Sequence, residues 1–527
     1  MPTTTGWAGC SAATWVGMAD VGDPGLVAPD ADEAGQEVLG MARGGALNVG
    51  GALFSQIAFF FITVLLARVL GRAQVGLYAQ GFAFLSLLGL LSLSGFRAGL
   101  TRFVALHLAD DDPAALRGTV RLGLGLSAGG AAVLGAGLVL AAPWLAHHVF
   151  TDPRLVTPLR YVGLTLPASV FIDAALSATQ GYRTMKPYAL VGLIFEPGLR
   201  ITLTAIALAG HHGLRGAMVA LVVSNYTGAI AAAVALRRLM GRIESTPRYV
   251  PRQLFSFSAI SWLASLASTG LIWADTILLG VYKSSADVGV YQVATRLVML
   301  AAFVMLPVNA AFAPRIADLH RRHRTESLRR TYAAATGWIL RLSLPGSVAC
   351  IAFRHELLAV FGHRFEAGAT VTLVLALGKL VDSATGPCGL MLNMSGRPVL
   401  SLVDNVGVLV VNVTLNLMLI PHYGIIGSAY AWAISLTLVN VVRVVQVKMV
   451  LDMYPFDAGE VKAFVAGGAA LLASIGVAHI THGILTLVVG GVVLAVVYVG
   501  GIAALGLGDN DRLALESLRP RAGTGGR

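Results

Sequence analysis

Long apolar runs alternate along this chain with short polar stretches that are rich in arginine, glycine, proline or histidine. A helix needs about 20 mostly apolar residues to cross a bilayer, and about fourteen runs have that length. Their approximate limits are 45–67, 77–96, 122–146, 161–180, 189–210, 217–236, 255–280, 288–312, 335–353, 370–392, 399–420, 425–447, 462–480 and 484–506. None alternates between apolar and polar positions as the strands of a membrane β-barrel do. The pattern therefore predicts an all-α integral membrane protein with about 14 transmembrane helices.

The composition excludes a water-soluble protein. Of the 527 residues, 56% are hydrophobic and 12% are charged, and the mean hydropathy is +0.75. A soluble domain has roughly 25% charged residues. An ordinary soluble enzyme, a disordered chain and a fibrous protein are therefore excluded. Cys10, Cys350 and Cys388 are too few and too scattered for a disulfide framework or a zinc site, so we expect no metal centre.

The basic residues predict which side of the membrane each loop faces. The loops after even-numbered runs, together with both termini, hold about 25 lysines and arginines, against about 8 in the other loops. Clusters within 237–252 and 315–330 contribute most of this excess. The net charge of +11 therefore reflects the positive-inside rule rather than a nucleic-acid partner. We expect both termini in the cytoplasm.

The chain contains an internal repeat. Val75-Gly76-Leu77-Tyr78 recurs 213 residues later as Val288-Gly289-Val290-Tyr291. Lys186-Pro187 matches Arg397-Pro398 at an offset of 211, and so do the turns around Gly213 and Gly424. The repeat places helices 1–6 over helices 7–12 in the same orientation, related by an axis along the membrane normal. We assign the matched glycines to the scaffold, because glycine permits tight turns and breaks helices.

The repeat also predicts how the chain is divided. We expect a disordered cytoplasmic tail (1–43), a first half with helices 1–6 (44–240), a second half with helices 7–12 (241–450), two extra helices 13 and 14 (451–507) and a cytoplasmic tail (508–527). Two such six-helix lobes form a transporter architecture, with a binding site at their interface.

Ionisable residues inside the membrane are candidates for function, because an unpaired charge in lipid is costly. The candidates are Asp173, Glu196 and Arg200 in the first half, and Asp275, Arg296, Arg341, Lys379, Asp382 and Asp404 in the second. Glu196 with Arg200 and Lys379 with Asp382 have the spacing of ion pairs on one helix, so local neutralisation and a role in transport both stay open. Asp275 and Asp404 either bind a coupling cation or neutralise a neighbouring arginine.

Arg296 and Arg341 have no acidic residue three or four positions away, so each must face a wet cavity or a partner on another helix. We predict a central cavity in which Arg296, Arg341 and Arg200 bind an anion, with Gln56 and Asn309 in its lining. Arginine binds phosphate bidentately, and its charge repels cationic drugs. A phosphorylated amphiphile fits, with its head in the cavity and its tail in lipid.

Three segments resemble a known family. They are Leu66-Ala67-Arg68 with Leu70-Gly71, Asp275 with Leu279-Gly280 and the turn at 288–291, and the stretch from Asn416-Leu417 through Tyr423-Gly424-Ile425 to Gly427-Ser428-Ala429. Over about residues 40–450 the sequence resembles the polysaccharide (O-antigen type) flippases of the multidrug/oligosaccharidyl-lipid/polysaccharide (MOP) exporter superfamily.

The resemblance implies a transporter that flips a polyprenyl-diphosphate-linked oligosaccharide, a precursor of cell-surface polysaccharide, from the inner to the outer leaflet of the plasma membrane. It implies alternating access and coupling to Na+ or H+, with no other cofactor. The implied partners are the lipid-linked oligosaccharide, membrane lipids and the polysaccharide polymerase machinery.

Other functions fit the sequence less well. An ion-coupled multidrug antiporter of the superfamily carries an acid in its first helix, and 45–67 has none. A peptidoglycan-precursor lipid flippase has basic residues in that helix, whereas here only Arg43 and Arg68 flank it. A glycosyltransferase would need an acidic pair in an early outer loop, and a polymerase a large outer loop. The loop near Gly71 and the stretch 354–369 provide neither, so we expect no enzyme.

Overall fold

The computed structural model describes residues 31–93, 95–241, 245–456 and 458–506. Residues 1–30 of the predicted N-terminal tail and the predicted tail at 508–527 lie outside the described residues. The chain divides into two units, residues 1–44 and 45–527. Helix α1 (Ala31–Leu70) starts well before residue 45, so part of the predicted disordered tail is helical.

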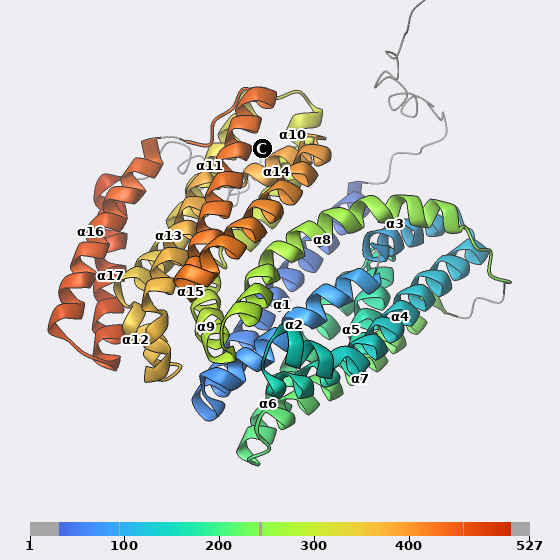
Figure 1. Ribbon diagram of the computed structural model, residues 1–527. Helices are drawn as coiled ribbons and strands as arrows, with labels where there is room; N and C mark the ends of the chain where they lie inside the picture. Colours follow the sequence, from blue (N-terminus) through green and yellow to red (C-terminus); the bar gives the residue numbers. More distant parts are fainter. Residues whose placement is uncertain (1–30, 94, 242–244, 457, 507–527) are drawn as a thin grey trace, which may run out of the picture. The chain divides into compact units, whose positions relative to one another are not determined.

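The first half continues with six further helices (Figure 1). They are α2 (Arg72–Leu93), α3 (Phe96–Ala109), α4 (Pro113–Trp144), α5 (Val156–Gly181), α6 (Glu196–Ala209) and α7 (Gly213–Met240). π-helical turns at Leu145–Val149 and Tyr188–Phe195 extend α4 and precede α6.

The second half contains α8 (Pro251–Tyr282), α9 (Ser285–Ala301), α10 (Met305–Arg321), α11 (Thr325–Ala352), α12 (Arg354–Ala359), α13 (Ala369–Thr385), α14 (Cys388–Met394) and α15 (Pro398–Leu451). α16 (Ala458–Ile480) and α17 (Ile484–Leu505) follow the second half. All fourteen predicted runs lie on helices, so the all-α membrane fold is confirmed.

The number of spans depends on how the broken helices are counted. Within the described residues, 12 helices are long and apolar enough to cross a membrane, or up to 13 if the bent pair α9 and α10 is one span. Segment α15 holds the two predicted runs 399–420 and 425–447, and its backbone leaves the helical region at Gly424 (φ 59°, ψ −133°). Hydrogen bonds from Arg443 to Asn405 and from Gln446 to Asp404 hold its two arms side by side.

Three runs predicted as single helices are interrupted. The run 370–392 is split at Gly386, whose φ is 66°, into α13 and α14. The run 77–96 ends as α2 and continues as α3 after Gly95, whose φ is 76°. The run 288–312 is split into α9 and α10, which meet at 48°. At the repeat offset of 213, Gly95 corresponds to Val308 inside α10, so the break in the second half comes a few residues earlier.

The backbone repeats with the predicted spacing. α2 starts at Arg72 and α9 at Ser285, which are 213 residues apart. Left-handed residues recur as well: Arg183 and Gly396 are 213 apart, with φ of 56° and 76°. Gly213 and Gly424 are 211 apart, with φ of 60° and 59°, so these two glycines make turns as predicted.

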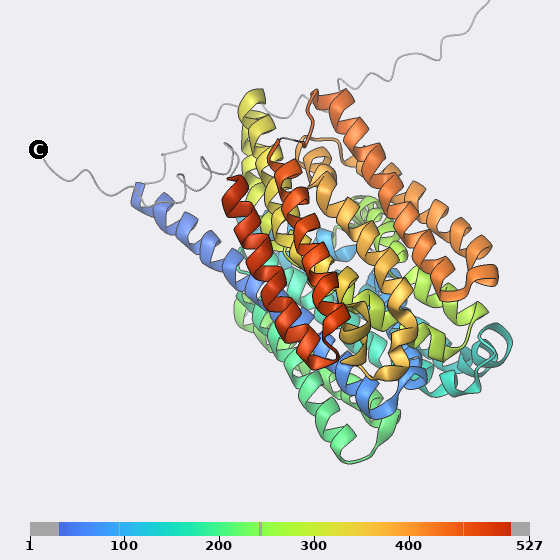
Figure 2. The same ribbon diagram turned by 90° about the vertical axis from the view of Figure 1, so that its left-hand side faces the viewer.

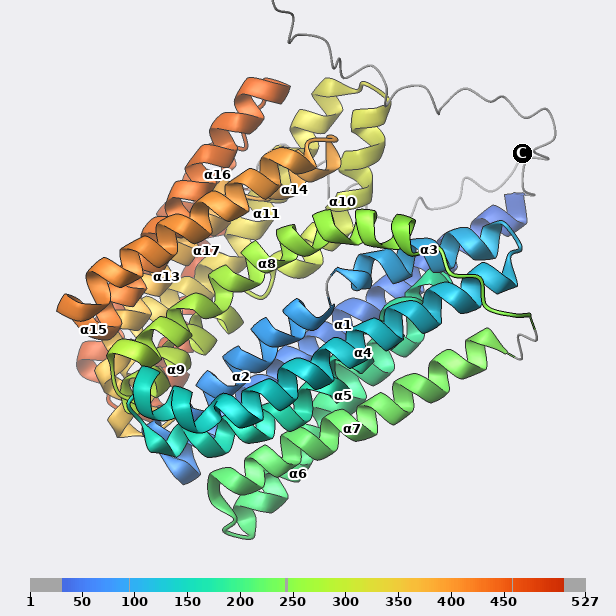
Figure 3. The same ribbon diagram turned by 45° about the vertical axis from the view of Figure 1, so that its right-hand side comes forward.

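The halves meet mainly through their early helices. α2 packs against both α8 and α9, and α8 also packs against α3, as Figure 3 shows. In each half, a central helix (α5 or α13) is surrounded by its neighbours. α16 and α17 pack on each other and against α11, on one face of the second half (Figure 2). A separate apolar cluster, containing Leu344, Ala466 and Leu494, holds them there.

Candidate functional site

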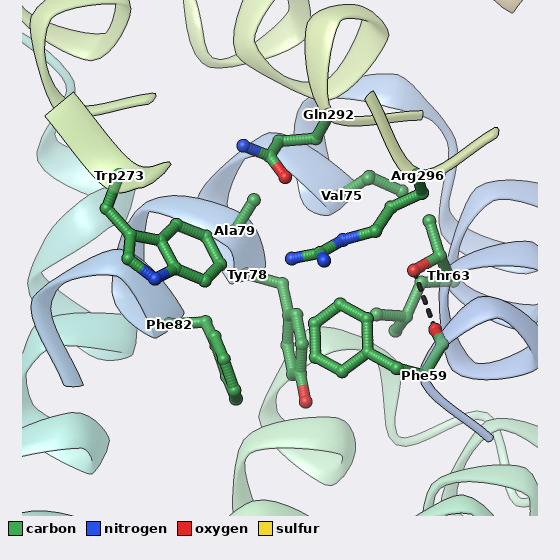
Figure 4. Close-up of a pocket in the computed structure, with 10 residues that line it drawn as sticks. Phe59, Thr63, Val75, Tyr78, Ala79, Phe82, Trp273, Gln292 and Arg296 are labelled. Atoms are coloured by element: carbon green, nitrogen blue, oxygen red, sulfur yellow. Dashed lines mark hydrogen bonds between the residues drawn. The ribbon is translucent and has the colours of Figure 1, made fainter. Parts of the chain in front are cut away.

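A small pocket lies between the two halves (Figure 4). It is lined by Phe59, Thr63 and Leu66 of α1, by Val75, Tyr78, Ala79 and Phe82 of α2, by Trp273 of α8, and by Gln292 and Arg296 of α9. Its empty space is about 300 Å³ with the open mouth included. The enclosed part has room for a water-sized molecule, so a larger ligand requires the halves to move apart.

Arg296 enters this pocket from α9, as the sequence predicts for a cavity residue. Its guanidinium carbon lies 4.1 Å from the ring centre of Phe59 and 5.4 Å from that of Trp273. Among the described residues, no carboxylate lies at ion-pair distance from this guanidinium. The positive charge of Arg296 is therefore met by aromatic faces rather than by an opposite charge.

The aromatic rings form a continuous lining around this charge. Phe59 and Phe82 meet edge to face at 5.1 Å between ring centres, and Phe82 lies 5.5 Å from Trp273. Cation–π contacts offset part of the cost of removing a guanidinium from water. The N–H groups of a guanidinium bind phosphate bidentately. The arrangement suits an anion.

Arg200 reaches the same rings from α6. Its guanidinium carbon lies 5.6 Å from the ring centre of Phe59 and 5.5 Å from that of Phe82. Its Nε is 3.8 Å from Glu196 Oε1, so the pair predicted from the spacing is present. Ser224 Oγ and Asn225 Nδ2 also donate to Glu196, at 3.0 and 3.2 Å. Glu196 thus neutralises Arg200 near the aromatic lining and leaves Arg296 without a carboxylate among the described residues.

The interface is closed by polar contacts at one end. Ser285 Oγ donates to Asp152 Oδ2 at 2.7 Å, and Arg154 donates two hydrogen bonds of 2.9 Å to the same carboxylate. The Arg154 bonds and then the Ser285 bond hold the pKa of Asp152 below its usual 3.8, although burial opposes them. Arg68 Nε donates to the Val360 carbonyl at 2.5 Å. This end belongs to the loops predicted to lie outside.

Asp275 lies in a buried network of neutral groups. Tyr291 Oη donates to it at 2.9 Å and Asn416 Nδ2 at 2.6 Å. Ser428 Oγ donates to Asn416 Oδ1 at 2.9 Å, and Asn412 Oδ1 accepts from Asn416 at 3.2 Å. Asp275 is 2% exposed and has no basic partner among the described residues. Of the two alternatives for this residue, neutralisation of an arginine is therefore not what the structure contains.

The other two candidate acids of the second half, Asp382 and Asp404, are paired. Lys379 Nζ lies 2.6 Å from Asp382 Oδ2, and Asn440 Nδ2 donates to Asp382 Oδ1 at 2.8 Å. Asp404 Oδ2 is 3.5 Å from Arg443 Nε. These pairs connect α13 and the two arms of α15, and none of their residues lines the pocket. Their charges are neutralised within the second half.

Three predicted cavity residues lie elsewhere. Arg341 is on the part of α11 that faces the extra helices, where Tyr498 Oη donates to its backbone carbonyl at 2.9 Å. Gln56 is exposed on α1, and Asn309 is half-buried on α10. None of the three lines the pocket, because helix packing turns them to other surfaces. Of the predicted binding residues, the pocket itself contains Arg296, with Arg200 against its aromatic lining.

The sequence alone does not reveal the aromatic lining. Phe59, Phe82 and Trp273 sit within apolar runs, where large side chains usually pack in a core. Gln292 and Tyr78 also line the pocket. Of these, Tyr78 carries a sequence signal, because it ends the first copy of the repeated Val-Gly-x-Tyr motif.

Comparisons with known proteins agree with this architecture. The family model described as polysaccharide biosynthesis protein matches residues 41–320, and the MatE model matches residues 261–418. The chain is 30% identical over 235 residues to the probable flippase AglR of Haloferax volcanii. The aligned segment covers 43% of this chain and 48% of that protein. It is 25% identical over 185 residues to the probable low-salt glycan biosynthesis flippase Agl15 of the same organism. This match covers 35% of this chain and 39% of that protein. The matches thus span less than half the length of these curated relatives.

Solved structures show the same fold. The lipid II flippase MurJ in an inward closed conformation has a TM-score of 0.67 at 13% identity, covering 86% of this chain and 98% of MurJ. An inward-facing multidrug transporter of the MATE family and MOP superfamily has a TM-score of 0.62 at 15% identity, and the match covers 75% of this chain and 94% of that protein. Since the polysaccharide biosynthesis model matches more than half of the chain, the protein belongs to that family, and the resemblance of its turns to MOP-superfamily polysaccharide flippases is confirmed.

Proposed function

We propose that this multi-pass membrane protein is a transporter, not an enzyme, and that it flips a polyprenyl-diphosphate-linked oligosaccharide from the inner to the outer leaflet of the plasma membrane. One observation carries the proposal: Arg296 lies in a pocket between the halves, with no carboxylate partner among the described residues. A buried guanidinium of this kind is suited to a phosphate.

The family and the relatives support the same substrate class. The curated relatives are named as flippases, one of them in glycan biosynthesis. A site between two repeated halves is what alternating access requires, because the halves can close on either side of it. The diphosphate would bind at Arg296, with the sugars in the space between the halves and the polyprenyl chain in the bilayer.

A multidrug antiporter is the weaker alternative. The apolar span Leu47–Leu70 contains no acid, and the charged residue in the pocket is a cation. A cationic drug would be repelled there. A peptidoglycan-precursor flippase would use the same diphosphate chemistry, so the glycan tested has to separate these two functions.

We further propose that coupling to Na+ or H+ occurs at Asp275. Asp275, Asn412, Asn416, Ser428 and Tyr291 bring side-chain oxygens of three helices together in the second half. A hard cation prefers oxygen ligands, and a buried carboxylate also accepts a proton readily. Asp275→Asn keeps the size of the side chain and removes its charge. We expect flipping by this variant to lose its dependence on a Na+ or pH gradient, whereas a preserved dependence would contradict this site.

The arginine distribution places both termini in the cytoplasm in this proposal. The flipped lipid would then be delivered to polysaccharide polymerase machinery on the outer side. Accessibility of tags at the two ends of the chain tests the orientation independently of transport.

The decisive experiment measures flipping in proteoliposomes. The full-length protein is reconstituted with a fluorescent polyprenyl diphosphate that carries a short oligosaccharide, and a membrane-impermeant quencher follows its movement. We expect Arg296→Ala to lower the rate at least about tenfold, since a hydrogen bond to a charged group contributes about 1.5 to 3 kcal/mol. Arg322→Ala is the matched control, because this arginine is exposed and pairs with Asp318 on the surface.

Two results would contradict the proposal. One is a wild-type protein that does not move the lipid-linked oligosaccharide under any gradient. The other is an Arg296→Ala variant that flips as fast as the Arg322→Ala control.

A further inference from the structure

The hydroxyl of Tyr78 is a buried polar group that the fold leaves unused. Tyr78 lines the pocket and is 4% exposed, and its Oη has no hydrogen-bond partner among the described residues. In Figure 4 this hydroxyl points away from the guanidinium of Arg296, alongside the ring of Phe59. Burying a hydroxyl without a hydrogen bond costs free energy. A ligand that binds during part of the transport cycle would provide the missing hydrogen-bond acceptor.

The repeat provides an internal reference for this tyrosine. Tyr291 stands at the same place in the second copy, 213 residues later, and its hydroxyl donates to Asp275 at 2.9 Å. The first half offers no such carboxylate on α1, because Leu47–Leu70 contains no Asp or Glu. The two tyrosines have therefore diverged: the fold satisfies Tyr291 and leaves Tyr78 with a free donor.

The charges around Tyr78 define what would pair with it. Arg200 lies 5.5 Å from the ring centre of Phe82, which stacks with Tyr78, and Arg296 lines the same pocket as Tyr78. Arg200 and Arg296 also repel each other, and Glu196 is the carboxylate that lies 3.8 Å from Arg200. Like Tyr78 Oη, Arg200 Nε has no hydrogen-bond partner among the described residues. Two unused donors and an excess positive charge are the complement of an anion with several acceptor oxygens.

We propose that Tyr78 and Arg200 form a second phosphate subsite, which takes one phosphate of a polyprenyl diphosphate while Arg296 takes the other. This inference rests on the proposed function and names the part of the substrate that the first half recognises. Tyr78 Oη and Arg200 Nε donate to oxygens of the same phosphate group. The bound anion also relieves the repulsion between Arg200 and Arg296.

The subsite makes the protein selective for a diphosphate over a monophosphate. A monophosphate binds at Arg296, which lines the pocket, and leaves the Tyr78 and Arg200 position empty, whereas a diphosphate fills both. Phe59 contacts both guanidinium groups in this closed state, so its ring must turn aside before one ligand can reach both. Tyr78 is thus a specificity-determining residue.

Binding measurements on the full-length protein test this role. The probes are two sugar-free lipids, a polyprenyl diphosphate and the corresponding polyprenyl monophosphate, and the variant is Tyr78→Phe. We expect Kd for the diphosphate to rise about tenfold, as the loss of a hydrogen bond to a charged acceptor implies, and Kd for the monophosphate to stay unchanged. Tyr332→Phe is the matched control, because Tyr332 also has a buried hydroxyl without a partner among the described residues and does not line the pocket.

The thermal stability of the same variants separates binding from folding. Removal of an unsatisfied hydroxyl should leave Tm unchanged or raise it in Tyr78→Phe. The double variant Tyr78→Phe with Arg200→Gln should lose less diphosphate affinity than the two single losses combined, because both groups would act on one phosphate.

Three outcomes would overturn the subsite. They are an unchanged Kd for the diphosphate in Tyr78→Phe, an equal loss of affinity for both lipids, and a lower Tm that shows the hydroxyl to be engaged in the fold. A wild-type protein that binds neither lipid would instead refute the proposed function.

Discussion

Gly76 of α2 and Gly289 of α9 lie directly against each other where the two halves cross. A Cβ on Gly76 would stand 1.7 Å from the Ser285 carbonyl oxygen, and a Cβ on Gly289 would stand 2.0 Å from the Arg72 carbonyl oxygen. Since 72 and 285, like 76 and 289, are 213 residues apart, the contact is reciprocal. The local two-fold axis of the repeat therefore passes between these glycines, next to the pocket.

This contact predicts that Gly76→Ala holds the halves apart. The added methyl group meets backbone rather than a flexible side chain, so α9 must shift. Overpacking costs about 1 to 3 kcal/mol, which corresponds to a change of about 5- to 150-fold in the balance between closed and open states. We expect slower flipping and faster reaction of an Ala79→Cys variant with an impermeant thiol reagent added from the predicted outer side.

Gly137→Ala on α4 is the control, because nothing lies within 4 Å of a Cβ at that position. Equal thiol reactivity in the Gly76→Ala and Gly137→Ala backgrounds would show that the α2–α9 crossing does not close the pocket.

The contact between Asp152 and Ser285 predicts a pH dependence. Because its pKa is below 3.8 in the folded protein, Asp152 stays ionised and accepts the Ser285 hydroxyl at neutral and mildly acidic pH. A depressed carboxyl pKa stabilises the contact above the unfolded value, and this stabilisation is lost as the pH falls through the folded value. The reaction rate of Ala79→Cys is divided by that of free cysteine at the same pH, because the thiolate fraction itself changes with pH. This relative reactivity should therefore stay constant from about pH 8 to about pH 5.

Asp152→Asn should raise this reactivity at every pH in that range, because it removes the charge that Arg154 binds. Asp111→Asn lies in an exposed loop of the first half and should leave this reactivity unchanged. A relative reactivity of Ala79→Cys that rises between neutral and mildly acidic pH, with Asp152 intact, would contradict the assignment to Asp152.

Glu196→Gln should destabilise the first half. Arg200 would keep its buried charge without a carboxylate, and breaking a buried ion pair costs about 3 kcal/mol or more. We expect a clear fall in Tm in detergent. The double variant Glu196→Gln with Arg200→Met removes both charges and should recover most of the lost Tm while flipping stays low. Recovery of flipping together with Tm would show that Arg200 has no part in binding.

The pair formed by Asp404 and Arg443 should matter for stability and not for transport. It joins the two arms of α15 outside the pocket. The double variant Asp404→Asn with Arg443→Gln keeps hydrogen-bonding groups in place, so we expect the flipping rate per folded molecule to stay within about twofold of wild type. A tenfold loss of rate at normal Tm would instead assign this pair to the transport cycle.

Helix formation and the repeat could be read from the sequence for a simple reason. Membrane spans need long apolar runs, and backbone turns such as those at Gly213 and Gly424 need residues that tolerate left-handed conformations. Ion pairs at three- or four-residue spacing, such as Glu196 with Arg200, are also local. Arg296 could be predicted as a cavity residue because its own helix contains no partner for it.

Contacts between distant segments could not be predicted in this way. Arg296 and Arg341 look alike in the sequence, yet one enters the pocket and the other faces the extra helices. Asp275 and Asp404 also look alike, but Tyr291 and Asn416 satisfy the first and Arg443 pairs with the second. The partner of a buried charge depends on which faces of two helices pack together. The pattern of apolar residues along one helix does not predict this packing.

The sequence by itself determined that this chain crosses the membrane many times, that it consists of two copies of one unit, and that a few charges stand where lipid would otherwise be. These properties depend on residue type and spacing along one helix. Only the tertiary structure decided that Phe59 lies under Arg296, that Gly76 meets Gly289, and that Tyr78 is left with a free hydroxyl. Each of these depends on how closely helices from different parts of the chain approach one another, and packing between helices sets that distance.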